Sequence, residues 1–330
     1  MKTKHLKFSI ILWISLIPFL SNAQSIKIYS ERQPLLIEPL LKEFEKKTKI
    51  EVQWMYSQKG LVQKIILEKN RPVADVYLSS DISRLIDIAD AGATIQLNQG
   101  FQVPDYLQST DWVGLTQRAR VFYVVDELAT QELDYEDLVN DQFKGRICIR
   151  SGFHPYNLSL FASLLAHYGE TWLEEYLRTL KSHLARRPQG NDRDQVKAIY
   201  AGVCDISIGN HYYYFQMMEN ENQKKWLEKT KIIFPNQGNR GSHVNISGIA
   251  LLKEDSRDIV EQLITFLLSD EAQKVYANDN NEFPVSPNIP VSSKVQELGG
   301  EVIFDKLALS EIANNRSKVV QILNQINFDG

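Results

Sequence analysis

The sequence predicts an α/β fold built as two lobes. Short apolar segments typical of strands alternate with amphipathic segments typical of helices, and the alternation resumes after a polar connection in the middle of the chain. This alternation predicts mostly parallel sheets covered by helices. The chain has 330 residues, and above roughly 250–300 residues a single hydrophobic core usually divides, which favours two lobes over one.

Three strand–helix pairs are predicted in the first part of the chain. The strands are residues 25–29, 50–55 and 73–78. The first helix begins at Pro34 or Pro39, because proline is favoured in the first turn of a helix. The next two helices are residues 61–67 and 82–91, and Gly92 ends the last of them.

The second part of the chain repeats this pattern less regularly. Its predicted strands are residues 145–150, 202–208 and 244–252. Its predicted helices are residues 158–168, 172–180, 259–276 and 307–326. Three prolines, Pro284, Pro287 and Pro290, predict a loop over residues 278–294.

Composition and missing motifs exclude several classes of protein. The formal net charge is −4, whereas nucleic-acid-binding domains usually carry a basic excess. Two cysteines are too few for a disulfide scaffold or a cysteine-ligated zinc cluster. The chain also lacks glycine-rich phosphate loops, a Gly-x-Ser-x-Gly elbow and a His-Glu-x-x-His zinc pair. We therefore assign no catalytic residue and do not expect an enzyme.

The first 23 residues have the pattern of a cleavable export signal. Lys2, Lys4 and Lys7 precede an apolar run over residues 8–20, and small residues follow it. The run is shorter than the ~20 residues that a membrane-spanning helix needs; a buried N-terminal helix is the alternative. Removal of this segment takes away three lysines and no acid, so the mature net charge is −7. We expect a soluble, exported protein, and no cysteine follows the run that would carry a lipid anchor.

Tyrosines gather after two of the predicted strands. Tyr212, Tyr213 and Tyr214 follow the strand over 202–208, and Tyr156 follows the strand over 145–150. Ligands of open α/β sheets bind beyond the carboxyl ends of the strands. Phenolate oxygens are hard donors that suit small, highly charged cations, and three of them would neutralise Fe³⁺. Tyrosines are also favoured in strands and at cleft edges, so a purely structural role is the alternative.

Two cysteines are placed in the same way relative to the tyrosines. Cys148 and Cys204 each lie eight residues before a tyrosine, Tyr156 and Tyr212. If their strands are parallel neighbours, the cysteines lie at one level and can form a disulfide in an oxidising compartment; two buried free thiols are the alternative.

Arg118 and Arg120 share one face of a predicted strand. They could hold a planar oxyanion or form surface ion pairs.

Several segments, in this order and spacing, carry a resemblance to a known family. They are residues 29–34 (YSERQP), 74–81 (ADVYLSSD), 115–121 (LTQRARV), 145–152 with Tyr156 and Asn157, 187–192 (RPQGND), 208–213, 234–236 (FPN) and 243–248 (HVNISG). Over nearly the whole mature chain the sequence resembles the periplasmic ferric-ion-binding proteins, which are iron-delivering substrate-binding proteins of ABC transporters.

The resemblance implies a type II periplasmic-binding-protein fold, in which two lobes close on a hinge of crossing strands. One lobe would comprise residues 24–117 and 240–288, and the other, with the tyrosines, residues 118–239 and 289–330. The crossing strands would lie near residues 115–120 and 234–241.

The resemblance also implies roles for individual residues. Tyr212 and Tyr213 match the adjacent tyrosine pair that binds iron in the family, and Tyr156 matches the third tyrosine of its three-tyrosine branches. Arg118 matches the arginine that holds a synergistic carbonate.

Some relatives place histidine, or histidine and tyrosine, where this chain has Gln33 and Pro34, which are poor ligands. Gln33 would instead hydrogen-bond the anion. Asn210 would support the tyrosine pair from behind, and we do not assign ligand roles to His154 or His211.

The expected function is capture of Fe³⁺, with carbonate, in the periplasm and delivery to an inner-membrane ABC permease and its ATPase. The protein would be a monomer without a membrane anchor or a nucleic-acid partner. A binding protein for another cargo, such as a polyamine, thiamine or an oxyanion held in an aromatic cage, is the alternative. A secreted hydrolase is a more distant one.

Overall fold

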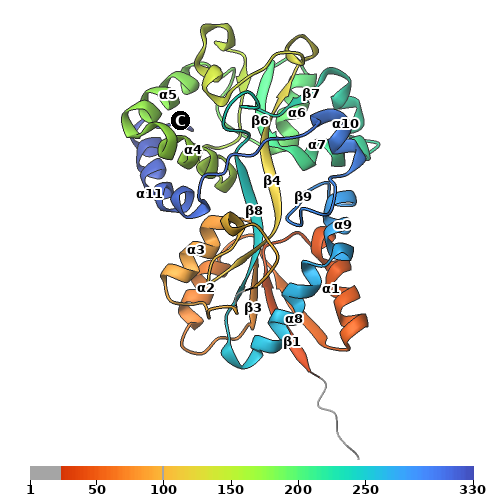
Figure 1. Cartoon of the computed structure of the whole chain (residues 1–330). Helices are drawn as coiled ribbons and strands as arrows, with labels where there is room; N and C mark the ends of the chain where they lie inside the picture. Colours follow the sequence, from red (N-terminus) through yellow and green to blue (C-terminus); the bar gives the residue numbers. More distant parts are fainter. Residues whose placement is uncertain (1–23, 99) are drawn as a thin grey trace, which may run out of the picture.

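Two lobes joined by long strands form the molecule in the computed structural model, which describes residues 24–98 and 100–330. The strands β4 (Val113–Val124) and β8 (Val244–Leu251) run from one lobe into the other (Figure 1). The predicted α/β class is confirmed, but the expectation of mostly parallel sheets is wrong. The sheet is mixed, because β4 and β8 pair with their neighbours in the antiparallel sense. The predicted export signal, residues 1–23, lies outside the described residues.

The first lobe contains the strand–helix pairs predicted for the start of the chain. They are β1 (Ser25–Ser30), α1 (Pro34–Thr48), β2 (Glu51–Tyr56), α2 (Leu61–Glu68), β3 (Val76–Ser79) and α3 (Ile82–Asp90). β1 lies between β2 and β3 and is parallel to both, whereas β8 pairs with β3 in the antiparallel sense. Apolar residues of α1, such as Leu40 and Phe44, are buried, while Lys42 on its other side is exposed.

The second lobe is built around the far half of β4. There β4 pairs in the antiparallel sense with β6 (Ile206–Asn210) and β7 (Lys231–Ile233), and β5 (Ile147–Cys148) lies parallel to β6. Its α-helices are α4 (Pro155–Tyr168), α5 (Glu170–Ser182), α6 (Asp192–Tyr200) and α7 (His211–Met218). Short 3₁₀ turns are Asp105–Leu107, Asp126–Leu128, Tyr135–Val139, Asp141–Phe143, Lys224–Lys229 and Glu254–Ser256.

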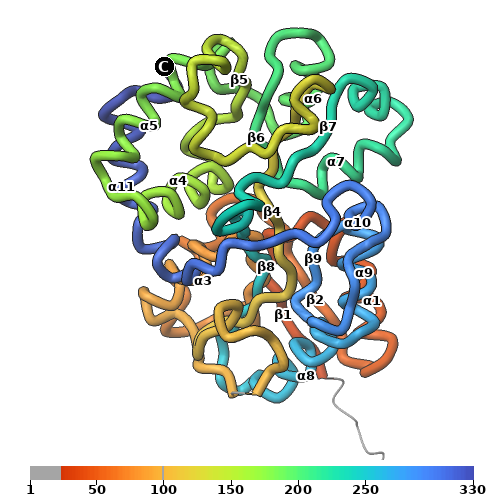
Figure 2. Tube along the Cα trace, turned by 45° about the horizontal axis from the view of Figure 1, so that its top comes forward, coloured from red at the N-terminus to blue at the C-terminus, as the bar shows by residue number. Residues whose placement is uncertain are grey.

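The last part of the chain returns to both lobes. α8 (Arg257–Leu267) and α9 (Asp270–Asn278) cover the first lobe, and β9 (Phe283–Pro284) pairs with β4 near the junction. After α10 (Ser293–Gly299) the chain crosses the molecule to α11 (Leu309–Gln325), as the blue tube in Figure 2 shows. α11 packs against α4 of one lobe and α3 of the other.

Three sequence predictions about these elements are wrong. The helix expected over 259–276 is two helices, because Ser269 accepts a hydrogen bond from the Ala272 amide and starts α9 anew. The loop expected over 278–294 contains β9 and the start of α10. The crossing strand expected near 234–241 is a turn with Asn236 at a φ of 60°. β8 crosses instead, because it pairs with both β3 and β4.

The division of the chain into 24–117 with 240–288 and 118–239 with 289–330 stays a prediction. Among the helices of residues 24–98 and 100–330, none is long and apolar enough to cross a membrane.

Candidate metal centre

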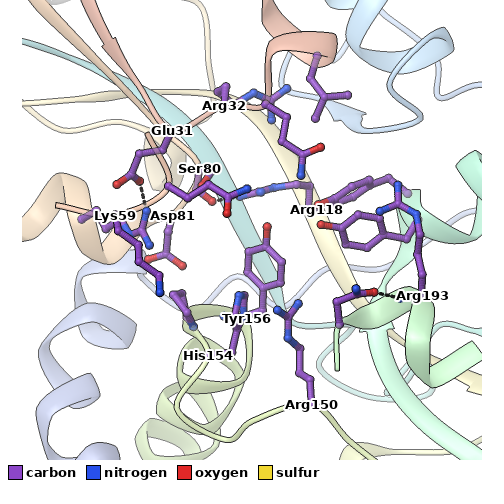
Figure 3. Close-up of a pocket in the computed structure, with 18 residues that line it drawn as sticks. Glu31, Arg32, Lys59, Ser80, Asp81, Arg118, Arg150, His154, Tyr156 and Arg193 are labelled. Carbon is purple, nitrogen blue, oxygen red and sulfur yellow. Dashed lines mark hydrogen bonds and ion pairs between the residues drawn. The ribbon is translucent and has the colours of Figure 1, made fainter. Parts of the chain in front are cut away.

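A cleft of about 430 Å³ lies at the junction of the lobes (Figure 3). Segments far apart in the sequence line it, from the loop after β1 to the start of α7. The lining residues are Glu31, Arg32, Gln33, Leu36, Gln58, Lys59, Ser80, Asp81, Arg84, Arg118, Arg150, His154, Pro155, Tyr156, Asn191, Arg193, Tyr212 and Tyr213. The structure therefore brings together five residues proposed from sequence: Gln33, Arg118, Tyr156, Tyr212 and Tyr213.

Two of these tyrosines stand at equivalent places in the fold. Tyr156 is the second residue of α4, which follows β5, and Tyr212 is the second residue of α7, which follows β6. The tyrosine triplet thus begins a helix directly at the end of its strand. Because β5 and β6 are parallel neighbours, both helices start at the same edge of the sheet, where they face the cleft.

The third member of the triplet does not belong to the cleft. The ring centroids of Tyr212 and Tyr213 lie 4.2 Å apart, and both side chains line the cleft. Tyr214 points elsewhere: its hydroxyl donates to the Thr230 carbonyl at 2.9 Å, and its ring lies against that of Tyr123. The tyrosines that could act together are therefore Tyr156, Tyr212 and Tyr213.

Burial controls the protonation of the tyrosine pair. Burial, and then the charge of the nearby Tyr156 phenol, raises the pKa of Tyr212 and of Tyr213 above the ordinary value. In the absence of a cation both phenols are protonated at neutral pH. A metal bound here must displace those protons, so only a cation of high charge density can hold the pair as phenolates.

Three guanidinium groups surround the ring of Tyr156. Their central carbons lie 5.8 Å (Arg118), 5.8 Å (Arg120) and 5.4 Å (Arg150) from the ring centroid. Figure 3 shows Tyr156 between Arg118 and Arg150. Arg118 and Arg120, which sequence placed on one face of a strand, therefore both come near this tyrosine, although only Arg118 lines the cleft.

Arg118 is suited to an anion. Its Nη2 donates to the carbonyl oxygens of Ser80 and Ile246, while its buried Nε has no protein acceptor. Because the side chain lines the cleft, its guanidinium can bind an oxyanion there.

A buried carboxylate organises the second lobe behind the tyrosines. Asp192 accepts from Arg120 at 3.0 Å, from Arg150 at 2.8 Å and from the backbone N–H of Asn210 at 2.9 Å. Burial alone would raise the pKa of Asp192, but Arg120 and then Arg150 outweigh it and lower that pKa. Asn210 also accepts from Arg120 through its side-chain oxygen at 2.9 Å. It lies behind the cleft, and its supporting role stays a prediction.

Gln33 and its neighbour come from the first lobe. Gln33 precedes the first residue of α1 and reaches the cleft. Arg32 is buried and makes two hydrogen bonds, at 2.7 and 2.8 Å, with the Glu282 carboxylate, and one at 2.5 Å with the Ser247 hydroxyl. The hydrogen bond with Ser247 ties the segment after β1 to β8, and the ion pair ties it to the residue before β9.

The two histidines next to the tyrosines are neutral. Burial and then Arg150 lower the pKa of His154 to about 3, and burial lowers the pKa of His211 to about 4. Nδ1 of each ring accepts a backbone N–H, from Tyr156 at 3.3 Å and from Ala119 at 3.2 Å respectively. Within residues 24–98 and 100–330, no three His, Cys, Asp or Glu side chains gather as a metal site. The three phenols are therefore the group of candidate metal-binding side chains on which the cleft's lining converges.

The structure joins Cys148 and Cys204 by a disulfide, with Cα atoms 5.8 Å apart. The prediction that the two cysteines lie at one level is wrong, because Cys148 aligns with Ser207 and Cys204 precedes β6. The bridge instead joins β5 to the segment that leads into β6.

Sequence reasoning missed several residues of the cleft and its surroundings. They are Glu31, Arg32, Lys59, Asp81, Arg84, Arg150, Arg193 and, behind the cleft, Asp192. Some lie in the family-like segments, but a charged residue in such a segment does not reveal which way its side chain points.

The sequence matches a family model and is similar to a known protein over nearly its whole length. Residues 96–299 match the family model of the bacterial extracellular solute-binding proteins. Iron uptake protein A2 of Synechocystis sp. is 33% identical over 94% of this chain and 93% of its own length.

Solved structures extend the likeness. The apo ferric-ion-binding protein A of Pasteurella haemolytica has a TM-score of 0.88 at 40% identity, covering 93% of this chain and 99% of that one. A Trichodesmium protein (IdiA, FutA) in complex with iron and citrate ligands has a TM-score of 0.86 at 31% identity, covering 92% and 99%.

Proposed function

The chain belongs to the bacterial extracellular solute-binding proteins, and among them to the periplasmic ferric-ion-binding proteins, and from this premise we propose that it captures Fe³⁺ in the cleft between its lobes. The observation that carries the proposal is the convergence of Tyr156, Tyr212 and Tyr213 on one cleft. Three phenolates match the charge and the hardness of Fe³⁺. The protein acts as a carrier rather than as an enzyme.

The charges around the cleft argue against cationic cargo. Six of its lining side chains are Arg or Lys, and two are carboxylic acids, Glu31 and Asp81. A polyamine or thiamine would meet this excess of positive charge unfavourably. Fe³⁺ differs from these cations because it creates its own negative partners by displacing phenol protons.

Arg118 would hold a synergistic anion beside the metal. Its place in the lining of the cleft and its position near Tyr156 support a planar oxyanion such as carbonate. Gln33, from the opposite lobe, would hydrogen-bond the same anion. All three direct protein ligands would then come from the second lobe, and the anion would link the metal to the first.

We place the protein in the periplasm, after cleavage of residues 1–23, as the monomeric partner of an ABC permease and its ATPase. Movement of the lobes about β4 and β8 would cover and uncover the cleft. Protonation of the phenolates or of the anion would favour release, so iron affinity falls in acid.

Absorbance titration of the mature protein with Fe³⁺, with and without bicarbonate, tests the proposal. Phenolate-to-iron charge transfer gives a visible band, whereas an oxyanion bound without metal gives none. The expected result is a coloured complex with one iron per protein, formed more tightly when bicarbonate is present. A colourless protein that retains no iron would overturn the proposal.

A further inference from the structure

Arg193 makes the closest cation–aromatic contact around the candidate iron site. Its guanidinium carbon lies 4.4 Å from the ring centroid of Tyr213. By comparison, the three guanidinium carbons around Tyr156 lie between 5.4 and 5.8 Å from that ring. At 4.4 Å the cation lies over the ring of Tyr213, where its attraction to the π electrons is strong.

Two contacts hold Arg193 in this place. Its backbone N–H, in the first turn of α6, donates to the Asn191 side chain at 2.9 Å, and Asp194 completes the cap by accepting the Asn191 N–H at 2.8 Å. At the other end, Nη2 donates to Oε1 of Gln216 at 2.6 Å. Gln216 lies on α7 one turn after Tyr213. The guanidinium is therefore fixed between the ligand-bearing helix and α6, on the opposite side of the cleft from Lys59 (Figure 3).

The charge of Arg193 is not used elsewhere in the described protein. Three of the arginines that line the cleft have a carboxylate partner: Arg32 with Glu282, Arg84 with Glu31, and Arg150 with Asp192. Within residues 24–98 and 100–330, Arg118 and Arg193 are the lining arginines that form no ion pair.

Charge balance indicates that Arg118 and Arg193 have the same role at the iron site. Three phenolates neutralise Fe³⁺, and a bound carbonate leaves two negative charges on the complex. Arg118, beside the expected anion, and Arg193, over Tyr213, offset those two charges. Because Tyr212 and Tyr213 are buried, charge on their oxygens is less screened than it would be in water, so each compensating charge matters more.

We propose that Arg193 is a positioning residue for iron: it fixes the ring of Tyr213 and compensates the negative charge that this phenolate carries into the complex. The proposal rests on the proposed function, since it assumes that Tyr213 binds Fe³⁺. It assigns Arg193 no direct bond to the metal. The planar guanidinium is required because it stacks on the ring and bonds Gln216 at the same time, which an ammonium cannot do equally well.

The test compares the visible spectrum and the ferric-iron affinity of four variants with those of the parent. Arg193→Gln removes the charge, and Arg193→Lys keeps the charge but lacks the planar guanidinium. Gln216→Ala removes the side chain that accepts a hydrogen bond from that guanidinium. Lys197→Gln is the matched control, because Lys197 lies one turn further along α6 and covers the ring of Trp226 instead. Thermal unfolding of the iron-free variants checks that each is folded.

Arg193→Gln should weaken iron binding about ten-fold, the lower end of what supporting residues around a metal contribute. Its band should move to longer wavelength, because removal of a nearby cation raises the energy of the phenolate donor electrons. Arg193→Lys should recover part of both effects, Gln216→Ala should show a smaller loss in the same direction, and Lys197→Gln should match the parent.

A parent that forms the coloured complex, together with an Arg193→Gln variant of unchanged affinity and band, overturns the inference and leaves the proposed function standing. An equal loss in Lys197→Gln overturns it as well, because the effect would then be one of general charge. If the parent gives no coloured complex, the proposed function itself fails.

Discussion

Tyr156 and Tyr212 occupy the same position, the second residue of the helix that comes next after a strand, in two neighbouring parallel strand–helix units. This repetition explains how two phenols 56 residues apart come to face one cleft. Tyr213, next along α7, adds a third. Behind them, Asp192 and Arg120 contact residues at the two helix starts, and the disulfide joins the chain segments that precede both helices. Each of these supports can be tested separately.

Loss of the disulfide should cost stability. The bridge closes a loop of 56 residues, and removal of a native disulfide typically costs about 2–5 kcal/mol. The double variant Cys148→Ser with Cys204→Ser leaves no free thiol and should lower the free energy of unfolding by this amount in denaturant titrations. It should also bind Fe³⁺ less tightly, because the starts of α4 and α7 are less well fixed. Unchanged stability and affinity would contradict this supporting role.

Asp192 should contribute strongly to stability through its buried ion pairs. In Asp192→Asn the buried guanidinium of Arg120 loses its carboxylate, and so does Arg150. Removing one partner of a buried pair costs about 3–5 kcal/mol. Asp194→Asn is the control on the same helix: Asp194 only completes the cap of α6, so its loss should cost about 1 kcal/mol. Chemical denaturation measures both, and equal losses would refute the assignment.

His243 should make the folded protein less stable in mild acid. Burial, and then Arg120, lower the pKa of His243 to about 3, below the value of about 6.5 expected in the unfolded chain. Between these values the unfolded chain binds a proton that the folded chain does not, so stability is full above about pH 6.5 and falls as the pH falls.

The midpoint of thermal unfolding, measured from pH 7.5 to pH 4.5, should decline accordingly. The decline should be shallower in His243→Gln, whose side-chain amide can still contact the Ser159 hydroxyl. In the parent, that hydroxyl lies 3.0 Å from Nε2 of His243. Another buried histidine with a lowered pKa, His211, keeps part of the slope. A variant with the parent's full slope would show that His243 does not cause the decline.

Arg118 should be responsible for any dependence of iron binding on bicarbonate. The parent should bind Fe³⁺ more tightly as bicarbonate is added, whereas Arg118→Gln should bind weakly and respond little. Lys59→Gln removes another cation of the same cleft and should keep the response to bicarbonate. Affinity measured by competition with a coloured chelator distinguishes these cases. A full bicarbonate response in Arg118→Gln would place the anion elsewhere.

Features that depend on the order of strands and helices along the chain could be predicted from the sequence. Alternating strands and helices predicted the α/β class, and the rule that ligands bind beyond strand ends correctly brought Tyr156 near Tyr212. The break before α9 was missed because the apolar pattern continues through it, although Ser269 followed by Asp270 and Glu271 is a helix-start signal.

Side-chain direction and long-range pairing could not be obtained in this way. Nothing local indicates that Asp192 points behind the cleft while its neighbour Arg193 points into it, since that depends on where α6 begins. Likewise, the apolar run of β8 predicts a strand, but its place between β3 and β4 is set by tertiary pairing. Tertiary packing also determines that the Tyr214 side chain points away from the cleft, toward Thr230.

Ferric-iron titration of three adjacent tyrosine variants tests the central claim most directly. Tyr212→Phe, Tyr213→Phe and Tyr214→Phe each remove one hydroxyl from the same helix, but only the first two remove it from the cleft. The visible band and the affinity of Tyr214→Phe should match those of the parent. Tyr212→Phe and Tyr213→Phe should lose most of the band and bind iron at least about 100-fold more weakly, since loss of a direct ligand should exceed the 10–100-fold cost of losing an outer-shell partner. Colour and affinity that survive in both would contradict the account.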